Sequence, residues 1–360
     1  MLVRKRSQQQ LGRRSWSLCA YVAAVLATFW TGQIASAQLV FTNYNSANSG
    51  LGSNFVYDVV ASGSTIFAAT VGGGLGVSIS GGSSWDNLTN ANSGLGNNVV
   101  FSTFFDSNTL YAGTNGGGLS IATSGSSTFT NRTTSNGLGS DSVRGVYASG
   151  STIYASTSAG LSISTDGGST FVNRTVSDGL VSLNITSVTA NGTNVYAGAT
   201  GGLNISTDGG AQFVNFTSSN GLAGNIVNWV YADGGTVYAA TDGGLSVTTT
   251  NGASFTNFTT ASGLVNNYVE SVFANGSTIY AGTIGGLSVS TDGGGTWTNY
   301  TTNLGDNVIY GVYADSNFVY AATGGGVSIA PIPVPEPSTW IMAAVGIALA
   351  SCRALRARLA

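Results

Sequence analysis

The chain has 360 residues, of which 53 are glycine, a share about twice the average that indicates many turns. A hydrophobic content of 42% is enough for a folded core and argues against disorder. Residues 38–330 carry three arginines against thirteen aspartates and glutamates, a formal charge of −10, which disfavours a nucleic-acid partner.

The first 37 residues have the three parts of a secretory signal peptide. Basic residues precede an apolar run over 18–30, and Ala35 and Ala37 form a small-x-small cleavage site before Gln38. The run is too short for a permanent membrane span, so we expect cleavage after Ala37. Arg13 and Arg14 weakly match a twin-arginine signal, which leaves Sec and twin-arginine export both open.

One unit repeats seven times along the body of the chain. Its marker is an aromatic residue followed by small residues, and successive markers are 40 to 44 residues apart. This period lies in the range of β-propeller blades. The seven markers are Phe67, Tyr111, Tyr154, Tyr196, Tyr238, Tyr280 and Tyr320.

Each unit contains four predicted strands joined by turn residues. In the sixth unit they cover 268–274, 277–283, 287–291 and 296–301, and the joins are rich in Gly, Asn, Asp and Ser. Small residues such as Ala281 and Gly282 suit sheets that pack closely face to face. No helical apolar period interrupts the pattern.

The seventh unit stops after its third strand, at Ala330, and Pro331 interrupts any continuation. Residues 40–44 match the fourth strand of the sixth unit, 296–300, in pattern. The sequence therefore predicts an all-β fold: residues 38–330 form a seven-bladed β-propeller whose last blade is closed by the mature N-terminal strand.

Parts of the unit resemble two known families of propeller repeat. The segments 263–269, 279–283 and 285–287 resemble the two-component-regulator propeller repeat, which implies the input domain of a signalling receptor. The segment 290–297, Ser-Thr-Asp-Gly-Gly-Gly-Thr-Trp, resembles the Asp-box (BNR-like) repeat of sialidase-type propellers. Segments 164–171 and 206–213 match the Asp-box as well, while the other copies lose the aspartate, as at Ser80, Ser124 and Thr250.

Catalysis has little support in the body. The Asp-box is explained as a hairpin turn, and one carboxylate per turn is too few for a calcium site. A sialidase would need three convergent arginines, but Arg132 and Arg174 fall on fourth strands and Arg144 on a first strand. Histidine is absent from the chain, and both cysteines lie outside the body. We therefore expect a non-enzymatic protein without metal or cofactor.

The motif Asn-x-Thr recurs at the same point of six fourth strands, and we attribute it to inheritance of the repeat rather than to a glycosylation series. The positions are Asn87, Asn131, Asn173, Asn215, Asn257 and Asn299.

The first strand holds the positions that vary most between copies. If this strand is innermost, the varied residues lie around the axial channel, where aromatic rings would stack on sugars and charged groups would pair with them. The alternative is drift at tolerant inter-blade positions. The candidate binding residues are Tyr57, Asp58, Arg144, Trp229, Glu270 and Tyr310.

The C-terminus has three parts: a Pro-rich spacer over 331–339 with Pro335, Glu336 and Pro337, an apolar segment over 340–352 predicted as a short transmembrane helix, and a basic cytoplasmic tail over 353–360. Together they resemble the PEP-CTERM sorting signal of Gram-negative bacteria. The resemblance implies an exosortase as partner and transient anchoring in the inner membrane. A plain membrane anchor would explain the helix and the arginines but not the Pro-Glu-Pro.

These features predict an exported propeller of the cell surface or extracellular matrix that binds extracellular polysaccharide or protein without catalysis. The second hypothesis is an extracytoplasmic sensor-type propeller that acts through a separate signalling partner. A degenerate sialidase-like hydrolase is the third.

Overall fold

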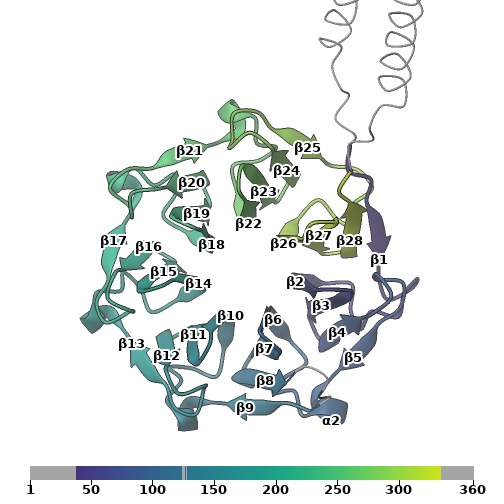
Figure 1. The fold of residues 1–360 in the computed structure, drawn as a ribbon, viewed down its shortest axis with the longest axis horizontal. Coiled ribbons are helices and arrows are strands. Elements are labelled where there is room, and N and C mark those ends of the chain that lie inside the picture. The colour runs from purple at the N-terminus through teal and green to yellow at the C-terminus, as the bar shows by residue number, and fades with distance from the viewer. Residues whose placement is uncertain (1–37, 124–125, 127, 334–360) are drawn as a thin grey trace, which may run out of the picture. The chain divides into compact units, whose positions relative to one another are not determined.

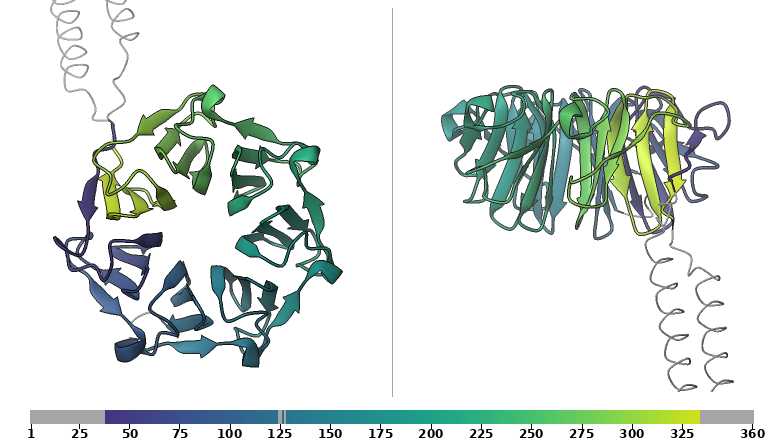
Figure 2. Two further views of the ribbon diagram at one scale, coloured as in Figure 1. Left: turned by 180° about the vertical axis from the view of Figure 1, so that it is seen from behind. Right: turned by 90° about the horizontal axis from the view of Figure 1, so that it is seen from above.

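The computed structural model describes residues 38–123, 126 and 128–333. In these residues, twenty-eight strands form seven four-stranded antiparallel sheets, arranged as blades around a common axis (Figure 1). The predicted all-β, seven-bladed propeller is confirmed. Val40–Ile332 forms one compact unit, and Figure 2 shows its strands running along the ring axis. The predicted signal peptide and the C-terminal segments from residue 334 on lie outside the described residues. Pro331, predicted to interrupt the third strand of the last blade, is instead its final residue and pairs with Phe318.

We call the four strands of each blade inner, second, third and outer. The inner strands are β2 (Val56–Ser62), β6 (Val100–Asp106), β10 (Val143–Ser149), β14 (Ile185–Asn191), β18 (Val227–Asp233), β22 (Val269–Asn275) and β26 (Ile309–Ala314). The second strands are β3 (Thr65–Thr70), β7 (Thr109–Thr114), β11 (Thr152–Thr157), β15 (Asn194–Ala199), β19 (Thr236–Thr241), β23 (Thr278–Thr283) and β27 (Phe318–Thr323).

The third and outer strands complete the blades. The third strands are β4 (Leu75–Ser78), β8 (Leu119–Thr123), β12 (Gly160–Ser164), β16 (Gly202–Ser206), β20 (Gly244–Thr248), β24 (Gly286–Ser290) and β28 (Gly326–Pro331). The outer strands are β5 (Asp86–Leu88), β9 (Thr130–Arg132), β13 (Val172–Arg174), β17 (Val214–Phe216), β21 (Thr256–Phe258), β25 (Thr298–Tyr300) and β1 (Thr42–Tyr44).

Short helical turns follow five of the outer strands: α2 (Asn90–Ser93), η1 (Thr134–Asn136), η2 (Val176–Asp178), η3 (Ser218–Asn220) and η4 (Thr260–Ser262). The outer strands are shorter than predicted. In the sixth blade β25 begins at Thr298 rather than Thr296, because the preceding two residues belong to the turn that the Asp-box forms.

The ring closes through the first and last strands of the body. β1 pairs with β28 in the register Thr42↔Ile329 to Tyr44↔Val327. The side chain of Asn43 strengthens the joint, since its amide donates to the carbonyl of Gly325 at 2.9 Å and its oxygen accepts from Ser328 at 3.1 Å. The predicted closure of the last blade by the strand at 40–44 is therefore confirmed, and no blade is left with an unpaired third strand.

The core lies between neighbouring blades, and its packing explains the small residues of the second strands. Ala281 is fully buried in one cluster with Tyr238 of the preceding blade and Val269 of its own. A Cβ on Gly282 would lie 2.8 Å from Cγ2 of Ile309 in the next blade, so a larger residue does not fit there. Close approach of adjacent sheets thus fixes alanine and glycine at this point of the repeat.

Each inner strand carries a β-bulge at its second residue. Pairing with the second strand shifts between the first and third residues in all seven blades, as between Val56 and Asp58 in β2. The second residue is therefore left out of the ladder. The bulge divides each inner strand into a short part before it and a longer part after it.

Candidate functional site

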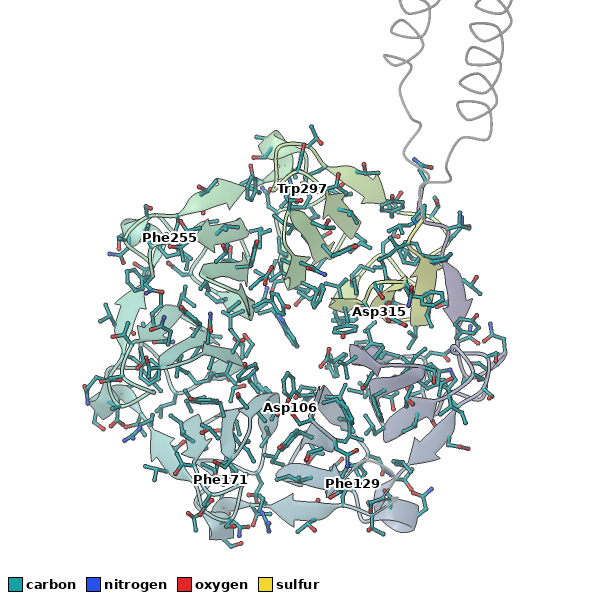
Figure 3. All side chains as sticks on the ribbon, in the orientation of Figure 1. Asp106, Phe129, Phe171, Phe255, Trp297 and Asp315 are labelled. Atoms are coloured by element: carbon teal, nitrogen blue, oxygen red, sulfur yellow. The ribbon has the colours of Figure 1, made fainter. Side chains whose placement is uncertain are left out.

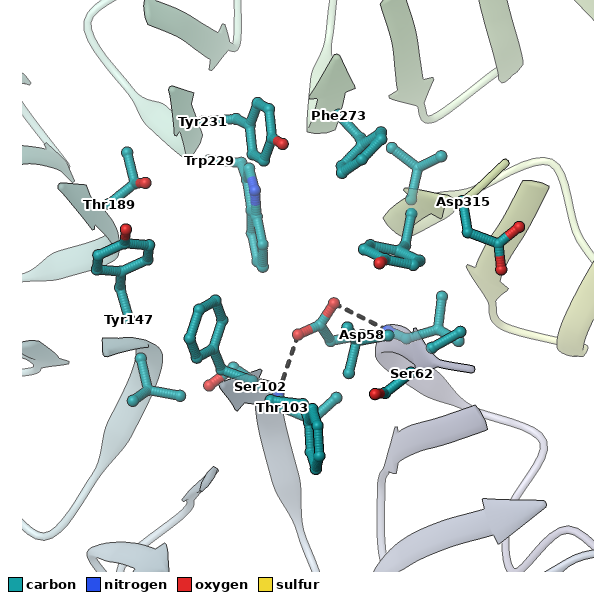
Figure 4. Close-up of a pocket in the computed structure, with 18 of the residues that line it drawn as sticks. Asp58, Ser62, Ser102, Thr103, Tyr147, Thr189, Trp229, Tyr231, Phe273 and Asp315 are labelled. Atoms are coloured by element: carbon teal, nitrogen blue, oxygen red, sulfur yellow. Dashed lines mark hydrogen bonds between the residues drawn. The ribbon is translucent and has the colours of Figure 1, made fainter. Parts of the chain in front are cut away.

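The inner strands of all seven blades line a funnel at one end of the axial channel, with a volume of about 700 Å³ (Figure 4). Its walls are the residues after the bulge, and its mouth lies beside the turns that follow β2 and β26. A cavity of this size suits a small ligand rather than a folded domain. We call it the axial funnel.

Aromatic side chains form a belt around the funnel. They come from the fifth residue of each inner strand, where the other two blades carry Val60 and Thr189. Members of the belt, which we call the aromatic belt, are Phe104, Tyr147, Tyr231, Phe273 and Tyr313. Neighbouring ring centroids are 4.9 to 5.1 Å apart, and the planes of neighbours are inclined by 46° to 57°, close to one seventh of a full turn. The rings therefore repeat one conformation around the axis.

Asp58 and Trp229 lie deeper in the funnel, at the third residue of their inner strands (Figure 4). The other blades have Ser or Gly at this position, so these two side chains break the symmetry of the ring. The indole of Trp229 projects into the middle of the funnel, toward the side that carries Asp58. An amphipathic ring and a carboxyl group thus share one space.

The carboxyl group of Asp58 is buried, with 5% of the residue exposed. One oxygen accepts from the backbone N–H of Val59 at 2.8 Å, and the other accepts from Thr103 of the next blade at 2.9 Å. Burial raises the pKa of Asp58 to about 7, although these two hydrogen bonds oppose the rise. Asp58 can therefore exchange a proton near neutral pH.

Two hydroxyl groups beside Asp58 are buried without a hydrogen-bond partner among the described residues. They are Ser102 Oγ and Thr103 Oγ1, and both residues line the funnel. A buried hydroxyl without a partner costs free energy unless a ligand or water supplies one. Both hydroxyl oxygens are closed to solvent, and Ser102 Oγ lies against Gly113 of the second strand, so they do not face the open funnel.

The structure separates the six predicted binding residues into two groups. Asp58 and Trp229, at the third position, line the funnel. The other four occupy the bulge position and are absent from the funnel walls: Tyr57, Arg144, Glu270 and Tyr310.

At the bulge end, Tyr57 and Tyr310 pack against each other with centroids 5.6 Å apart, and Phe55 and Phe101 join them. Burial raises the pKa of Glu270, whose negative charge also helps to raise the pKa of Tyr310.

Two other bulge residues serve the contact between blades. Thr186 donates to the carbonyl of Val227 at 2.5 Å, and Asn228 donates to the carbonyl of Val269 at 2.8 Å. At these two blades the bulge position has a structural role. This agrees with the alternative that variation there reflects inter-blade packing.

The Asp-box turns have a structural role as well. In the third blade, Asp166 accepts from the N–H and the hydroxyl of Thr170 and from Ser164. These bonds lower the pKa of Asp166 to about 2, with the N–H of Thr170 as the largest cause. Where the aspartate is lost, Ser80 and Thr250 accept the equivalent bonds from Ser84 and Ser254. Figure 3 shows the turn aromatics Phe171 and Trp297 near the periphery of the ring, far from the funnel.

The repeated asparagines hold loops of two kinds. Asn87, Asn131, Asn257 and Asn299 bond to the loop that enters their blade, and Asn43 and Asn173 bond to the turn between its second and third strands. Asn173, for example, accepts from Ser162 at 3.0 Å and donates to the carbonyl of Ala159 at 2.9 Å. Comparable bonds are made by Asn43, Asn87, Asn131, Asn257 and Asn299. These contacts explain why the residue recurs.

The arginines do not converge. Arg132 and Arg174 lie on outer strands opposite Leu119 and Leu161, and Arg174 forms an ion pair with Asp178 at 3.7 Å. Arg144 lies on an inner strand. The described residues contain no group of three or more metal-ligating side chains, and none of their helices is long and apolar enough to cross a membrane.

Sequence reasoning missed the aromatic belt. Its residues recur at one position of the repeat, as residues that maintain the fold do, whereas the predicted binding residues all lie at positions that vary between copies. The sequence did contain an indication: Phe or Tyr recurs in five copies at the fifth residue of the inner strand. Strand alternation places this residue on the same side as the third residue, the position of Asp58 and Trp229.

No family model matches the chain, and no curated protein sequence does. Among solved structures, an extracellular domain assigned to a hybrid two-component system of B. thetaiotaomicron aligns with a TM-score of 0.68 and 22% identity, over 85% of this chain and 42% of that one. An extracellular domain assigned to a one-component system of the same organism gives 0.66 and 18%, over 81% and 40%. A GH74 enzyme of Niastella koreensis gives 0.64 and 20%, over 82% and 54%.

This chain spans less than half the length of the two extracellular domains. At these identities the likeness establishes the fold: the chain is a seven-bladed propeller similar to the extracellular domains of bacterial sensor systems.

Proposed function

We propose that this chain is an exported, non-catalytic recognition propeller of the sensor type, which binds an extracellular saccharide in the axial funnel and acts through a separate signalling partner. The observation that carries the proposal is the funnel itself. It combines aromatic rings with the carboxyl group of Asp58, which has lone pairs left for a ligand. Sugar rings present apolar faces for stacking and hydroxyls for hydrogen bonds, so both halves of the site have a use.

Two findings support the sensor class. The chain resembles the two-component-regulator repeat in sequence, and its fold is similar to two extracellular domains of sensor systems. Those domains also support export, in line with the predicted signal peptide over residues 1–37. Separation of Arg132, Arg144 and Arg174 removes the arrangement that a sialidase would need.

The binding step is tested on residues 38–333, which contain every strand of the closed ring. We expect this fragment to bind saccharides on a glycan array without hydrolysing them. Trp229→Ala should weaken binding about tenfold, because it removes the central ring of the site. Tyr57→Ala is the matched control at the bulge end and should bind normally.

A loss of binding in Tyr57→Ala but not in Trp229→Ala would move the site to the bulge end. Hydrolysis that disappears in Glu270→Gln or Asp58→Asn would replace recognition by catalysis. For the sensor step, cross-linking of the full chain in its host should yield one membrane partner whose capture changes when the bound saccharide is added. A protein that shows no such partner and stays on the cell surface would fit the surface or matrix role instead.

The C-terminal residues favour a second element of the proposal, sorting by an exosortase. Pro335, Glu336 and Pro337 followed by an apolar segment and arginines carry this expectation. Mass spectrometry of the protein from its host should then find the chain beginning at Gln38 and lacking the residues after the Pro-Glu-Pro. Replacement of Glu336 by Ala should leave the tail attached and the protein in the inner membrane. An intact tail in the unaltered protein would instead indicate a permanent anchor.

A further inference from the structure

The charged groups in the axial funnel are all acidic. Among the residues that line it, Asp58 and Asp315 are the only charged ones, and arginine and lysine are absent. Asp315 at the mouth is already used, since it accepts from the hydroxyl of Tyr320 at 2.9 Å and from the backbone N–H groups of Asn317 and Phe318. Asp58 accepts one backbone bond on each oxygen and keeps further lone pairs for a ligand.

The phenols of the aromatic belt report the same electrostatic environment. Burial, followed by the charges of Asp233, Tyr313 and Tyr147, raises the pKa of Tyr231 to about 12. Burial also raises the pKa of Tyr147 and Tyr313, helped by Asp106 and Asp315 respectively. Burial disfavours a charge of either sign, whereas the contributions of Asp106, Asp233 and Asp315 disfavour anionic ligands in particular, such as uronic acids and phosphorylated sugars.

The same surroundings favour a cation. Aromatic faces attract ammonium groups through their quadrupole, and tryptophan does so most strongly. Trp229 and the belt supply such faces on one side, and Asp58 supplies a formal negative charge on the other. The lone pairs of Asp58 that its two backbone hydrogen bonds leave free can accept from an ammonium group.

From this geometry we infer that the axial funnel takes a saccharide with a free amino group, whose ammonium lies between Asp58 and Trp229. The inference rests on the proposed function, because it assigns the class of saccharide to the same site. An ammonium group of an amino sugar pairs with the carboxylate while the apolar face of the sugar ring lies against Trp229. An N-acetylated sugar of the same size lacks the charge.

Binding of such a ligand should release the proton of Asp58 at a mildly acidic pH, where the amine of the ligand is already protonated. Free Asp58 is partly protonated there, and a nearby ammonium favours its ionised form. The groups around Asp58 do not offset this effect. The inner strand β6 presents the neutral Ser102 and Thr103, and β26 presents Gly311 and the phenol Tyr313, followed by Asp315 at the mouth.

The test is calorimetry on residues 38–333 with a glucosamine trimer and the matched N-acetylglucosamine trimer. We expect the glucosamine trimer to bind about tenfold more tightly, with a preference that falls as salt is raised. Asp58→Asn should reduce the preference to about twofold or less, since it removes the charge. Glu270→Gln removes one acidic group at the bulge end and should keep the full preference.

A second measurement avoids dependence on the folding of the Asp58 variant. Titration of the unaltered protein at mildly acidic pH, where the amines are protonated, in two buffers of different ionisation enthalpy should show proton release with the glucosamine trimer and none with the acetylated one. Equal, Trp229-dependent binding of both trimers would overturn the inference and leave the proposed function standing. If neither trimer nor any other saccharide binds, the proposed function fails as well.

Discussion

The rim of the propeller and its axial channel are built from the same repeat, but they differ in how far their polar residues recur from blade to blade. At the rim, the three Asp-box acids and six of the seven equivalent asparagines have hydrogen-bond partners within the protein, as Asp166 has in Thr170 and Asn299 in Gly263. In the channel, Asp58 and Trp229 each occur in one blade, and nearby hydroxyls have no partner among the described residues. Residues that repeat between blades therefore serve the fold, whereas the residues that occur in one blade only, Asp58 and Trp229, mark the place where a ligand would bind.

The largest expected effect comes from breaking the rim at its joint. Removal of residues 38–44 deletes β1, exposes the edge of β28 and removes the buried ring of Phe41. We expect the free energy of unfolding to fall by at least about 4 kcal/mol, since loss of one buried phenylalanine alone costs about 3–5 kcal/mol. Urea unfolding followed by circular dichroism measures it. A loss below about 1 kcal/mol would show that the ring does not depend on this strand.

The next effect concerns the channel. Because the pKa of Asp58 is about 7 in the folded state and the ordinary value of an aspartate is 3.8, the folded state holds a proton that the unfolded state releases between these values. Stability due to Asp58 is therefore highest below the unfolded pKa and declines as the pH rises toward 7, by up to ~4 kcal/mol. Asp58→Asn should flatten this decline when urea unfolding is compared at acidic and mildly alkaline pH. An unchanged slope would contradict the burial of the acid.

A smaller effect on the free energy of unfolding is expected from the asparagines at the rim, and it should differ between Asn173 and Asn215. Asn173→Ala removes two hydrogen bonds and should lower the free energy of unfolding by about 1 kcal/mol. Asn215 is the matched control, because it is exposed and makes no side-chain hydrogen bond with the described residues. In its blade, Asn204 accepts from Val181 instead. Equal losses in both variants would mean that the bonds of Asn173 contribute nothing.

The smallest effect is that of an Asp-box acid. Asp166 has a folded pKa lowered to about 2, so its stabilisation is present above the unfolded pKa and is lost as the pH falls through 2. Asp166→Asn should therefore lower the melting temperature slightly at neutral pH and have less effect in strong acid. Thermal unfolding across this range measures the difference. A gap that widens in acid would reverse the sign and contradict the proposed role of the turn.

The sequence predicts the frame well because the frame repeats. The period of the marker aromatics, the turn residues and the match of 40–44 to 296–300 lead to seven blades and to the closed last blade. The division of the site could not be predicted, because a bulge of one residue leaves no mark on the spacing. Tyr57 and Asp58 are neighbours in sequence, yet only Asp58 lines the funnel. The pKa of Asp58 also depends on Thr103, which lies in another blade.

The closing sheet also decides how the propeller responds to force. The N-terminal end of β1 and the C-terminal end of β28 are paired with each other, at Thr42 and Ile329, so the chain enters and leaves the ring at one point. A pull that separates these ends breaks the pairs of β1 one after another, as a zipper opens, rather than shearing them all together. The three-residue joint is thus the weakest element under tension, and the ring would open there while its other six blades keep their strands.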